Sequence, residues 1–309
     1  MAETVHVGMI GMDTSHCGAF AGIFHEQLAD LNVRVVAAYP SFSPDLKSSV
    51  ERVDEYRTNL ADKHGVRMTD SIEAMLGMVD AVMIMSVDGR RHLAELRAVA
   101  HAGKPVFVDK PFAAGLADAR EMVRLIRRYD LPCWSSSSLR FDSGFGDVVG
   151  NPDKYGRIIG CDVHSPAHLE PTNPGLFWYG IHGVEILYTI MGPGCRSVSC
   201  TSTPEADVVI GTWSENRLGT LRGIRAGMPG YGATLLSEKQ PVTTLTARGD
   251  YYPALCREIA AFFRTRKAPV PIEVTLEICA FIDAAMRSAA VEADDIPVEL
   301  FPAGASAPA

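Results

Sequence analysis

The sequence lacks the features of membrane, secreted and nucleic-acid-binding proteins. No apolar run approaches the roughly 18–20 residues that span a bilayer. The first residues, MAETVHVGMIG, carry no basic region before their apolar run, so we expect no signal peptide. Acidic residues outnumber basic ones by 37 to 29, and a net charge of −8 disfavours nucleic acid and anionic membranes as partners.

Paired cysteine motifs are also missing. The seven cysteines are scattered and odd in number, with no CxxC pair, which argues against a disulfide framework and predicts reduced thiols in a cytoplasmic protein. For Cys17 we expect a packing role, with a reactive thiol as the alternative. There is neither an internal repeat nor a low-complexity block.

The first half of the chain alternates strand and helix signals. The segments TVHVGMIG, VRVVAAY, DAVMIMSV, PVFVDKP and LPCWSSSSL have strand patterns, and apolar residues at helical spacing separate them. DAVMIMSV is continuously apolar, as in a strand buried on both faces. This order predicts a doubly wound parallel sheet with right-handed crossovers, a Rossmann domain over residues 1–138.

The second half has a different character. RIIGCDVHS, RSVSCTST, DVVIGTW, RLGTLRGI and PVTTLTA are short and β-rich, and Gly, Pro, Asn and Ser separate them, which predicts an antiparallel meander. GIHGVEILYTIM, ALCREIAAFFRTRK and LEICAFIDAAMRSAA predict three helices. We therefore expect a second domain over residues 139–309, and no structure for the small-residue tail PAGASAPA.

The stretch GMIGMDTSH lies where a dinucleotide-binding protein has its phosphate loop. Gly11 can supply the first glycine, for the tight turn, but Asp13 replaces the second and His16 the third. A surface charge at Asp13 would oppose a phosphate by about 1 kcal/mol. Thr14 and Ser15 can donate to phosphate, and we predict that Asp13 caps the following helix. A structural turn without a ligand is the alternative.

No acidic residue ends the second strand, where a carboxylate would bind the adenosine ribose. VVAAYPSFS has Tyr39, Pro40 and Ser41 there. The missing acid disfavours NAD, and Ser41, Ser43 and Lys47 can receive a 2′-phosphate, so we predict that NADPH binds at least as well as NADH. An ordinary solvated loop is the alternative.

Two further segments carry candidate catalytic side chains. AGKPVFVDKPFA holds Lys110 between an acid and a proline at a strand end, and the carboxyl ends of parallel strands face the ligand crevice. A lysine there can bind a reacting hydroxyl. In FWYGIHGVEIL, His182 and Glu185 share one helical face, and a histidine is the natural acid or base near neutral pH. A surface lysine and a core histidine are the alternatives.

Four segments in order, VGMIG, DAVMIMSVDGRRHLAELRAVAHAGKPVFVDKPFA, GIHGVEILYTIMG and EIAAFFRTRKAPVPIEVTLEICAFIDAAMRSA, resemble the Gfo/Idh/MocA oxidoreductases, the glucose–fructose oxidoreductase and inositol dehydrogenase group. The most specific segment is AGKPVFVDKP, which is similar to the family's AGKHVxxEKP. The resemblance covers nearly the whole chain. It implies an N-terminal Rossmann domain and a C-terminal α/β domain whose open, mainly antiparallel sheet makes homodimers or homotetramers.

The resemblance also implies roles for single residues. Lys110 matches the family's catalytic lysine, His182 its proton-transfer histidine, Glu185 an acidic position one turn later, and Gly11 the first loop glycine. The expected catalytic residues are Lys110, His182 and Tyr179. The expected cofactor-binding residues are Gly11, Asp13, Thr14, Ser15, Ser41, Ser86, Asp109 and Lys110. The expected substrate-binding residues are Arg140, His164, Trp178 and Glu185.

The expected activity is NAD(P)-dependent oxidation or reduction of a sugar, polyol or related hydroxyl or ketone, with NADP or NAD as cofactor and no resident metal. The match departs from the family at three points, all near the cofactor or the proton relay: Asp13, the absent ribose acid, and Trp178 in place of an aspartate. These departures keep two alternatives open. One is a lyase or hydrolase, with or without a metal; the other is a catalytically silent ligand sensor.

A cluster of histidines and acids is the basis of the metal alternative. Asp162 and His164 alternate onto one strand face, and His168 and Glu170 follow in the loop. If His182 and Glu185 lie nearby, either a polar sugar pocket or a zinc or manganese site explains the set.

Overall fold

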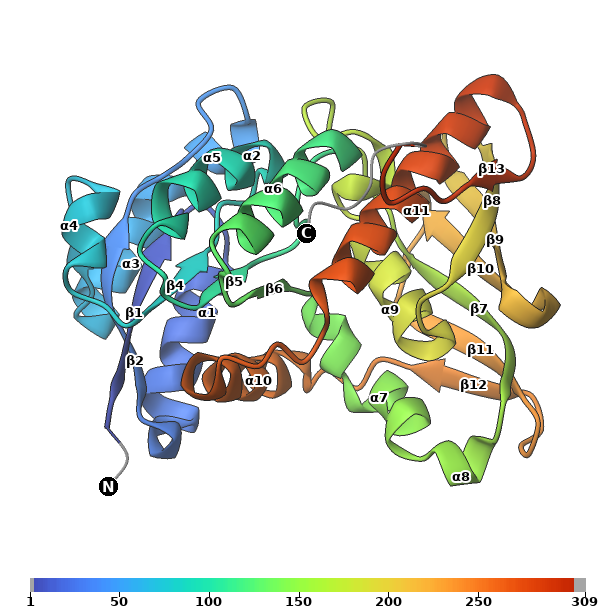
Figure 1. Ribbon diagram of the computed structural model, residues 1–309, viewed down its shortest axis with the longest axis horizontal. Coiled ribbons are helices and arrows are strands. Elements are labelled where there is room, and N and C mark those ends of the chain that lie inside the picture. The colour runs from blue at the N-terminus through green and yellow to red at the C-terminus, as the bar shows by residue number, and fades with distance from the viewer. Residues whose placement is uncertain (1–2, 303–309) are drawn as a thin grey trace. The chain divides into compact units, whose positions relative to one another are not determined.

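The computed structural model describes residues 3–302, which form two compact units. Within the described residues, the first unit comprises 3–136 and 252–272, and the second comprises 137–251 and 273–302. Each unit contains one sheet (Figure 1). The predicted domains, residues 1–138 and 139–309, stay a prediction; the compact units divide the chain after residue 136 and again at 252 and 272. The tail from residue 303 lies outside the described residues.

The first unit has a six-stranded, wholly parallel sheet in the order β3-β2-β1-β4-β5-β6. Its strands are β1 (Val5–Ile10), β2 (Val33–Tyr39), β3 (Arg67–Met68), β4 (Ala81–Ile84), β5 (Val106–Val108) and β6 (Cys133–Ser135). All four residues of β4 are buried, as its continuous apolar run predicts. The doubly wound parallel sheet is confirmed.

Helices cover both faces of this sheet, with α5 and α6 on one side and α1 and α10 on the other (Figure 1). The helices of the first unit are α1 (His16–Gly22) with the π-turn η1 (Ile23–Gln27), η2 (Ala29–Leu31), α2 (Lys47–Val50), α3 (Val53–His64), α4 (Ile72–Leu76), α5 (Gly89–Ala100), α6 (Leu116–Arg128) and α10 (Tyr251–Thr265). Phe262 of α10 packs on Trp134 of β6, which explains why this late helix belongs to the first unit.

The second unit has a seven-stranded mixed sheet in the order β12-β11-β7-β10-β9-β8-β13. Its strands are β7 (Ile158–Pro166), β8 (Cys195–Ser202), β9 (Ala206–Trp213), β10 (Leu218–Ile224), β11 (Gly232–Ser237), β12 (Thr243–Thr246) and β13 (Ile296–Pro297). Its helices are η3 (Ser138–Phe141), α7 (Ser143–Gly150), α8 (Pro152–Tyr155), η4 (Gly175–Phe177), α9 (Ile181–Met191), η5 (Ser214–Asn216) and α11 (Ile272–Val291).

The predicted meander is correct only for β8, β9 and β10, which are successive antiparallel neighbours. β7 runs parallel to β10, and β11, which the sequence pattern did not reveal, pairs antiparallel with β7. One face of the sheet is covered by α9, and Gly183 makes that contact close: a Cβ there would lie 2.4 Å from Ser165 Oγ and 2.5 Å from Leu221 Cδ1. The expected open, mainly antiparallel sheet is confirmed.

Candidate functional site: two polar clusters

The first glycine of the loop is required by the fold of the first unit. Gly11 follows β1 with a φ of +88°, a conformation that side chains disfavour. A Cβ at Gly11 would lie 2.4 Å from both the backbone nitrogen and the hydroxyl of Ser86, which follows β4. The predicted tight turn is therefore present, and its tightness comes from the contact between the ends of β1 and β4.

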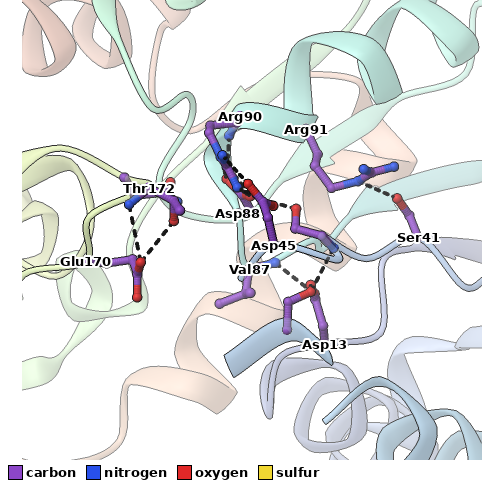
Figure 2. Close-up of polar contacts among 12 residues, drawn as sticks. Asp13, Ser41, Asp45, Val87, Asp88, Arg90, Arg91, Glu170 and Thr172 are labelled. Carbon is purple, nitrogen blue, oxygen red and sulfur yellow. Dashed lines mark hydrogen bonds and ion pairs between the residues drawn. The ribbon is translucent and has the colours of Figure 1, made fainter. Parts of the chain in front are cut away.

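Asp13 does not cap the first helix, so that prediction is wrong. The residue preceding α1 is Ser15, and it makes no side-chain capping bond. Asp13 is fully buried instead: one carboxylate oxygen accepts from the Ser49 hydroxyl at 2.5 Å and the other from the Val87 amide at 2.8 Å (Figure 2). Burial raises the pKa of this carboxyl, although both hydrogen bonds oppose the rise. The acid therefore ties together the segments after β2 and β4 and presents no exposed charge.

The serines assigned to the cofactor also have partners within the unit. Ser41 and Ser86 are buried, and both donate to the same oxygen of Glu95, at 2.6 and 2.7 Å. Ser43 is buried as well and donates to Asp88 at 2.6 Å. These hydroxyls cannot donate to a phosphate without leaving a buried carboxylate short of a partner, so Ser41 and Ser86 act first as supports of the fold.

Two arginines complete this cluster, which we call the first polar cluster. Arg90 binds Asp88 and makes a two-pronged contact with Asp45, at 2.9 and 2.8 Å. Arg91 donates through Nε to Ser41 at 2.9 Å and lies 3.3 Å from Glu95 (Figure 2). A pocket of about 250 Å³ lies here, lined by Ser43, Pro44, Asp45, Asp88, Arg90, Arg91 and Ala94.

A buried His–Asp pair replaces the close helix packing that a third glycine would allow. His16 Nδ1 lies 2.7 Å from Asp109 Oδ2, and both residues are buried. The imidazole stacks on Phe20 and meets the edge of Tyr252 from α10. Burial acts to raise the pKa of Asp109, but His16, with a smaller contribution from Lys110, outweighs it and leaves the pKa lowered.

Lys110 follows this pair at the carboxyl end of β5. It is half-buried, and its amine has neither a hydrogen bond nor an ion pair with any residue among 3–302. The other oxygen of Asp109 is buried and lacks a hydrogen-bond partner in the same range. A charged amine and a buried carboxylate oxygen thus remain available beside the end of the sheet.

A dinucleotide is compatible with this edge of the first unit. The backbone amides of Thr14 and Ser15 donate to no atom within the described residues, so they are available to a phosphate. Asp13 is turned inward, and the Lys110 amine has no hydrogen bond or ion pair among the described residues. The loop amides and Lys110 would therefore hold the cofactor, whereas the predicted donors Ser41 and Ser86 would not.

The second unit holds a separate cluster around α9, which we call the second polar cluster. His182 is buried, and its Nδ1 lies 2.6 Å from the hydroxyl of Ser137. Glu185, one turn later, accepts from the Ser137 amide at 3.1 Å and pairs with Arg140 at 2.6–2.7 Å. The side chains of Glu185 and Arg140 are 5% and 12% exposed, so each neutralises the other. Both were expected to bind substrate, but the ion pair holds the segment after β6 against α9.

Aromatic rings surround His182. Tyr179 meets it edge to face at 5.2 Å and also contacts His168 at 5.3 Å, and Tyr231 lies on it at 5.9 Å. Tyr179 therefore lies beside His182, as its predicted catalytic role requires. Trp178 follows η4 and is half-buried, so at the position of the family's aspartate the chain has an indole without acidity.

His164 does not join this cluster, which corrects the expected grouping. Ser165 faces α9, so its neighbour His164 lies on the opposite, exposed face of β7, together with Asp162. Asp162 accepts from Thr220 on that face at 2.6 Å. Over the described part of the chain, no three His, Cys, Asp or Glu side chains are grouped as metal ligands. The expected six-residue cluster is therefore divided between two faces of one sheet.

Ser137, Glu95 and Asp88 are functional or supporting residues that sequence reasoning missed. Ser137 lay within the run SSSS, in which no spacing distinguishes one serine from the next. Glu95 and Asp88 lay on or just before a correctly predicted helix. Their serine and histidine partners are 45 to 54 positions away, apart from Ser86, and only Asp88, just before the helix start, gave any signal.

The cysteines behave as predicted. All seven are free, and all except Cys200 are buried. Burial raises the pKa of the Cys17 thiol well above its usual value, with Asp13 and Asp109 adding to the rise. Cys17 therefore packs and is not a thiolate. Among the described residues no helix is long and apolar enough to cross a membrane.

Comparison with known families decides the class of the first unit. The model of the Gfo/Idh/MocA oxidoreductase family, described as an NAD-binding Rossmann fold, matches residues 5–136. Over these residues the chain is similar to an oxidoreductase family that binds NAD. The resemblance inferred from the sequence is therefore confirmed for the first unit.

Relatives and solved structures agree with this family. Uncharacterized oxidoreductase YhhX of Escherichia coli (strain K12) is 25% identical over 138 residues, which cover 41% of this chain and 40% of that protein. The chain thus matches less than half the length of this curated relative. A putative myo-inositol dehydrogenase from Sinorhizobium meliloti 1021 has a TM-score of 0.76 and 18% identity, covering 95% of this chain and all of that one.

Two further solved structures cover nearly the whole chain. One is the WlbA dehydrogenase of Bordetella pertussis in complex with NADH and UDP-GlcNAcA, with a TM-score of 0.76, 17% identity and coverage of 95% and 98% of the two chains. The other is a putative NADPH-dependent oxidoreductase from Desulfitobacterium hafniense DCB-2, with a TM-score of 0.78, 15% identity and coverage of 96% and 99%. At these identities they show the fold alone: both sheets of this chain follow the fold of these structures.

Proposed function

We propose that this chain is a Gfo/Idh/MocA oxidoreductase, an NAD(P)-dependent dehydrogenase or reductase that acts on the CH–OH group, or the corresponding ketone, of a sugar or polyol. The proposal is carried by the family match over residues 5–136 together with the Lys110 amine at the end of β5, which has no hydrogen bond or ion pair among residues 3–302. Solved structures of the same fold include dehydrogenases named for inositol, and one in complex with a nucleotide sugar.

The chain's residues have distinct parts in this proposal. A bound nicotinamide would supply or accept the hydride. His182 would take the hydroxyl proton during oxidation, or return it during reduction, through the nitrogen that does not face Ser137. Ser137 would position the imidazole by holding Nδ1. Lys110, in the first unit, would present its positive charge to the reacting end of the bound cofactor. Tyr179 would contact the substrate beside His182.

Titration of the purified protein with NADH and NADPH, followed by nicotinamide fluorescence, tests the cofactor part of the proposal. Turnover is then measured against a panel of polyols and sugars with the oxidised cofactors. We expect saturable binding and cofactor reduction with at least one polyol or sugar. If neither dinucleotide binds, the proposal is wrong, and the lyase, hydrolase and sensor interpretations take its place.

We further propose that the chain forms homodimers or homotetramers through the exposed face of the second sheet. Ile210 of β9 and Leu218 of β10 lie on this face, 42% and 52% exposed, beside Thr220 and Asp162. Large apolar side chains on an open sheet face favour burial against a second copy. Light scattering of wild type and Leu218→Glu tests this, and we expect the variant to have the smaller mass. The seven free thiols support the cytoplasmic location predicted from the sequence.

A further inference from the structure

In a Rossmann protein the segment after β2 distinguishes NAD from NADP. In this chain the residues of that segment differ from those that bind NAD. A carboxylate at this position binds the ribose hydroxyls of NAD, whereas a nearby arginine accommodates the 2′-phosphate of NADP. β2 ends at Tyr39 without an acid. The residue two positions later, Ser41, is held by Arg91, which comes from the first turn of α5.

Arg91 has binding capacity to spare. Its Nε is occupied by Ser41 and Glu95, which fix the plane of the guanidinium. Its two terminal nitrogens have no hydrogen bond or ion pair with any residue among 3–302, and Figure 2 draws a contact from Arg91 only to Ser41. The side chain is 37% exposed. A planar guanidinium with two free terminal NH2 groups matches a phosphate in a two-pronged contact.

The two acids and the other arginine of the pocket already bind one another. Asp45 and Asp88 both bind Arg90, and Asp88 also accepts from Ser43. Glu95 is 4% exposed and is not among the lining residues of the pocket, so it is not placed to accept from a ribose hydroxyl. Among the lining side chains, Arg91 therefore carries the cationic group with unfilled hydrogen-bonding capacity.

The pocket has the size of one group of a larger ligand. Its volume of about 250 Å³ is below the roughly 300–1,000 Å³ of sites that enclose a whole small molecule. A phosphate with the adjacent part of a ribose is a group of this kind. We infer that Arg91 selects dinucleotides that carry a 2′-phosphate, so that the chain uses NADPH in preference to NADH.

This inference rests on the proposed function, and it replaces the earlier basis for an NADP preference. Sequence reasoning assigned the 2′-phosphate to Ser41, Ser43 and Lys47. Ser41 and Ser43 donate to buried acids, and Lys47 is 85% exposed and lies near Glu51. The same cofactor class now depends on one residue of a different element.

Binding of NADPH, NADH, adenosine 2′,5′-bisphosphate and AMP is measured by fluorescence and calorimetry, without turnover, for wild type, Arg91→Ala and Arg91→Lys. We expect Arg91→Ala to lose about 30-fold in affinity for NADPH and for the bisphosphate, and less than about threefold for NADH and AMP. Arg91→Lys should be intermediate, because it keeps the charge and loses the two-pronged geometry.

Arg97→Ala is the matched control. Arg97 lies on the same helix, is 53% exposed and pairs with Glu121, so this variant removes the same charge away from the pocket and should bind all four ligands like wild type. Thermal unfolding verifies that each variant is folded, and if Arg91→Ala is not, Arg91→Lys decides the outcome. If Arg91→Ala loses affinity for NADPH and NADH equally, or for neither, the inference is wrong and the proposed function still stands. Failure of wild type to bind either dinucleotide overturns both.

Discussion

The two polar clusters use similar residues in different ways. In the first, three serines and two arginines donate to two buried acids, and Asp13 accepts from a hydroxyl and an amide. In the second, the buried acid Glu185 also pairs with an arginine, but the cluster includes a histidine, His182, whose Nδ1 lies against a hydroxyl.

This difference separates supporting groups from reactive ones. A carboxylate that takes several short bonds from neutral donors holds loops together, and its donors are not available to a ligand. A histidine with one ring nitrogen fixed is oriented for proton transfer through the other. The comparison predicts that changes in the first cluster act mainly on stability and cofactor affinity, and changes beside His182 mainly on turnover.

The largest effect is expected at His182. His182→Ala should lower kcat by about 10²–10⁴-fold, the usual range for a positioned acid or base, while affinity for the dinucleotide stays within about threefold. Steady-state kinetics and fluorescence titration measure the two quantities. The control is His164→Ala, on the opposite face of β7 from α9, which should keep wild-type turnover. Equal losses in the two variants would contradict the assignment of His182.

Glu185 should matter chiefly for stability. Glu185→Gln leaves the Arg140 guanidinium buried without its counter-charge, and breaking such a pair costs about 3–5 kcal/mol. Urea unfolding measures the loss. Glu185→Gln combined with Arg140→Met removes both charges and should recover part of the stability. If Glu185→Gln unfolds like wild type but binds substrate poorly, Glu185 is a substrate ligand after all.

Ser137→Ala should have a smaller, kinetic effect. Loss of one hydrogen bond of about 0.5–1.5 kcal/mol corresponds to a two- to twelvefold loss in turnover. Because the hydroxyl no longer lies against Nδ1 of His182, the pH profile of kcat should change as well. Ser137→Thr restores the hydroxyl and should restore both. A variant whose stability falls while its pH profile stays unchanged would assign Ser137 a purely structural role.

The smallest effect is a pH dependence at Asp13. Its pKa is raised above the usual 3.8, so as pH rises the unfolded chain loses this proton before the native state does. The contribution of Asp13 to the free energy of unfolding of the wild type therefore falls as pH rises from 3.8 to the raised pKa. Asp13→Asn can keep both contacts and does not titrate. Its stability relative to wild type should rise with pH through that window and then level off, as urea unfolding from about pH 4 to about pH 8 would show. If the difference in free energy of unfolding between Asp13→Asn and wild type does not change with pH, the protonation of Asp13 is not coupled to folding.

Much of the fold could be predicted from periodicity. Five of the six parallel strands, the helices α5, α6, α9 and α11, and the turn at Gly11 follow from local pattern, whereas β3, of only two residues, was missed. Pairing of distant strands could not be predicted, because the pattern of β7 is the same whether its neighbour runs parallel or antiparallel. β11, GATLLS, was missed because it is short and begins with glycine.

The candidate site was predictable in its catalytic residues and less so in its binding residues. Lys110 and His182 belong to motifs whose position on a strand end or a helix face follows from local sequence. Ser41, Ser86 and Glu185 have the right chemistry for ligands, but chemistry alone does not reveal an internal partner. Arg91 was passed over because it looks like an ordinary exposed residue at a helix start.

The sequence by itself determined the family resemblance, the parallel sheet, the reduced cysteines and the two catalytic candidates, because these depend on local spacing and residue type. Only the tertiary structure decided which polar groups are occupied. Asp13 turned inward because burial with two donors, Ser49 and the Val87 amide, satisfies its carboxylate. Arg91 kept two nitrogens free because Glu95, from the next turn of the same helix, and Ser41, from 50 positions away, engage only its Nε. Such long-range pairing is set by how strands and helices pack, and no local pattern encodes it.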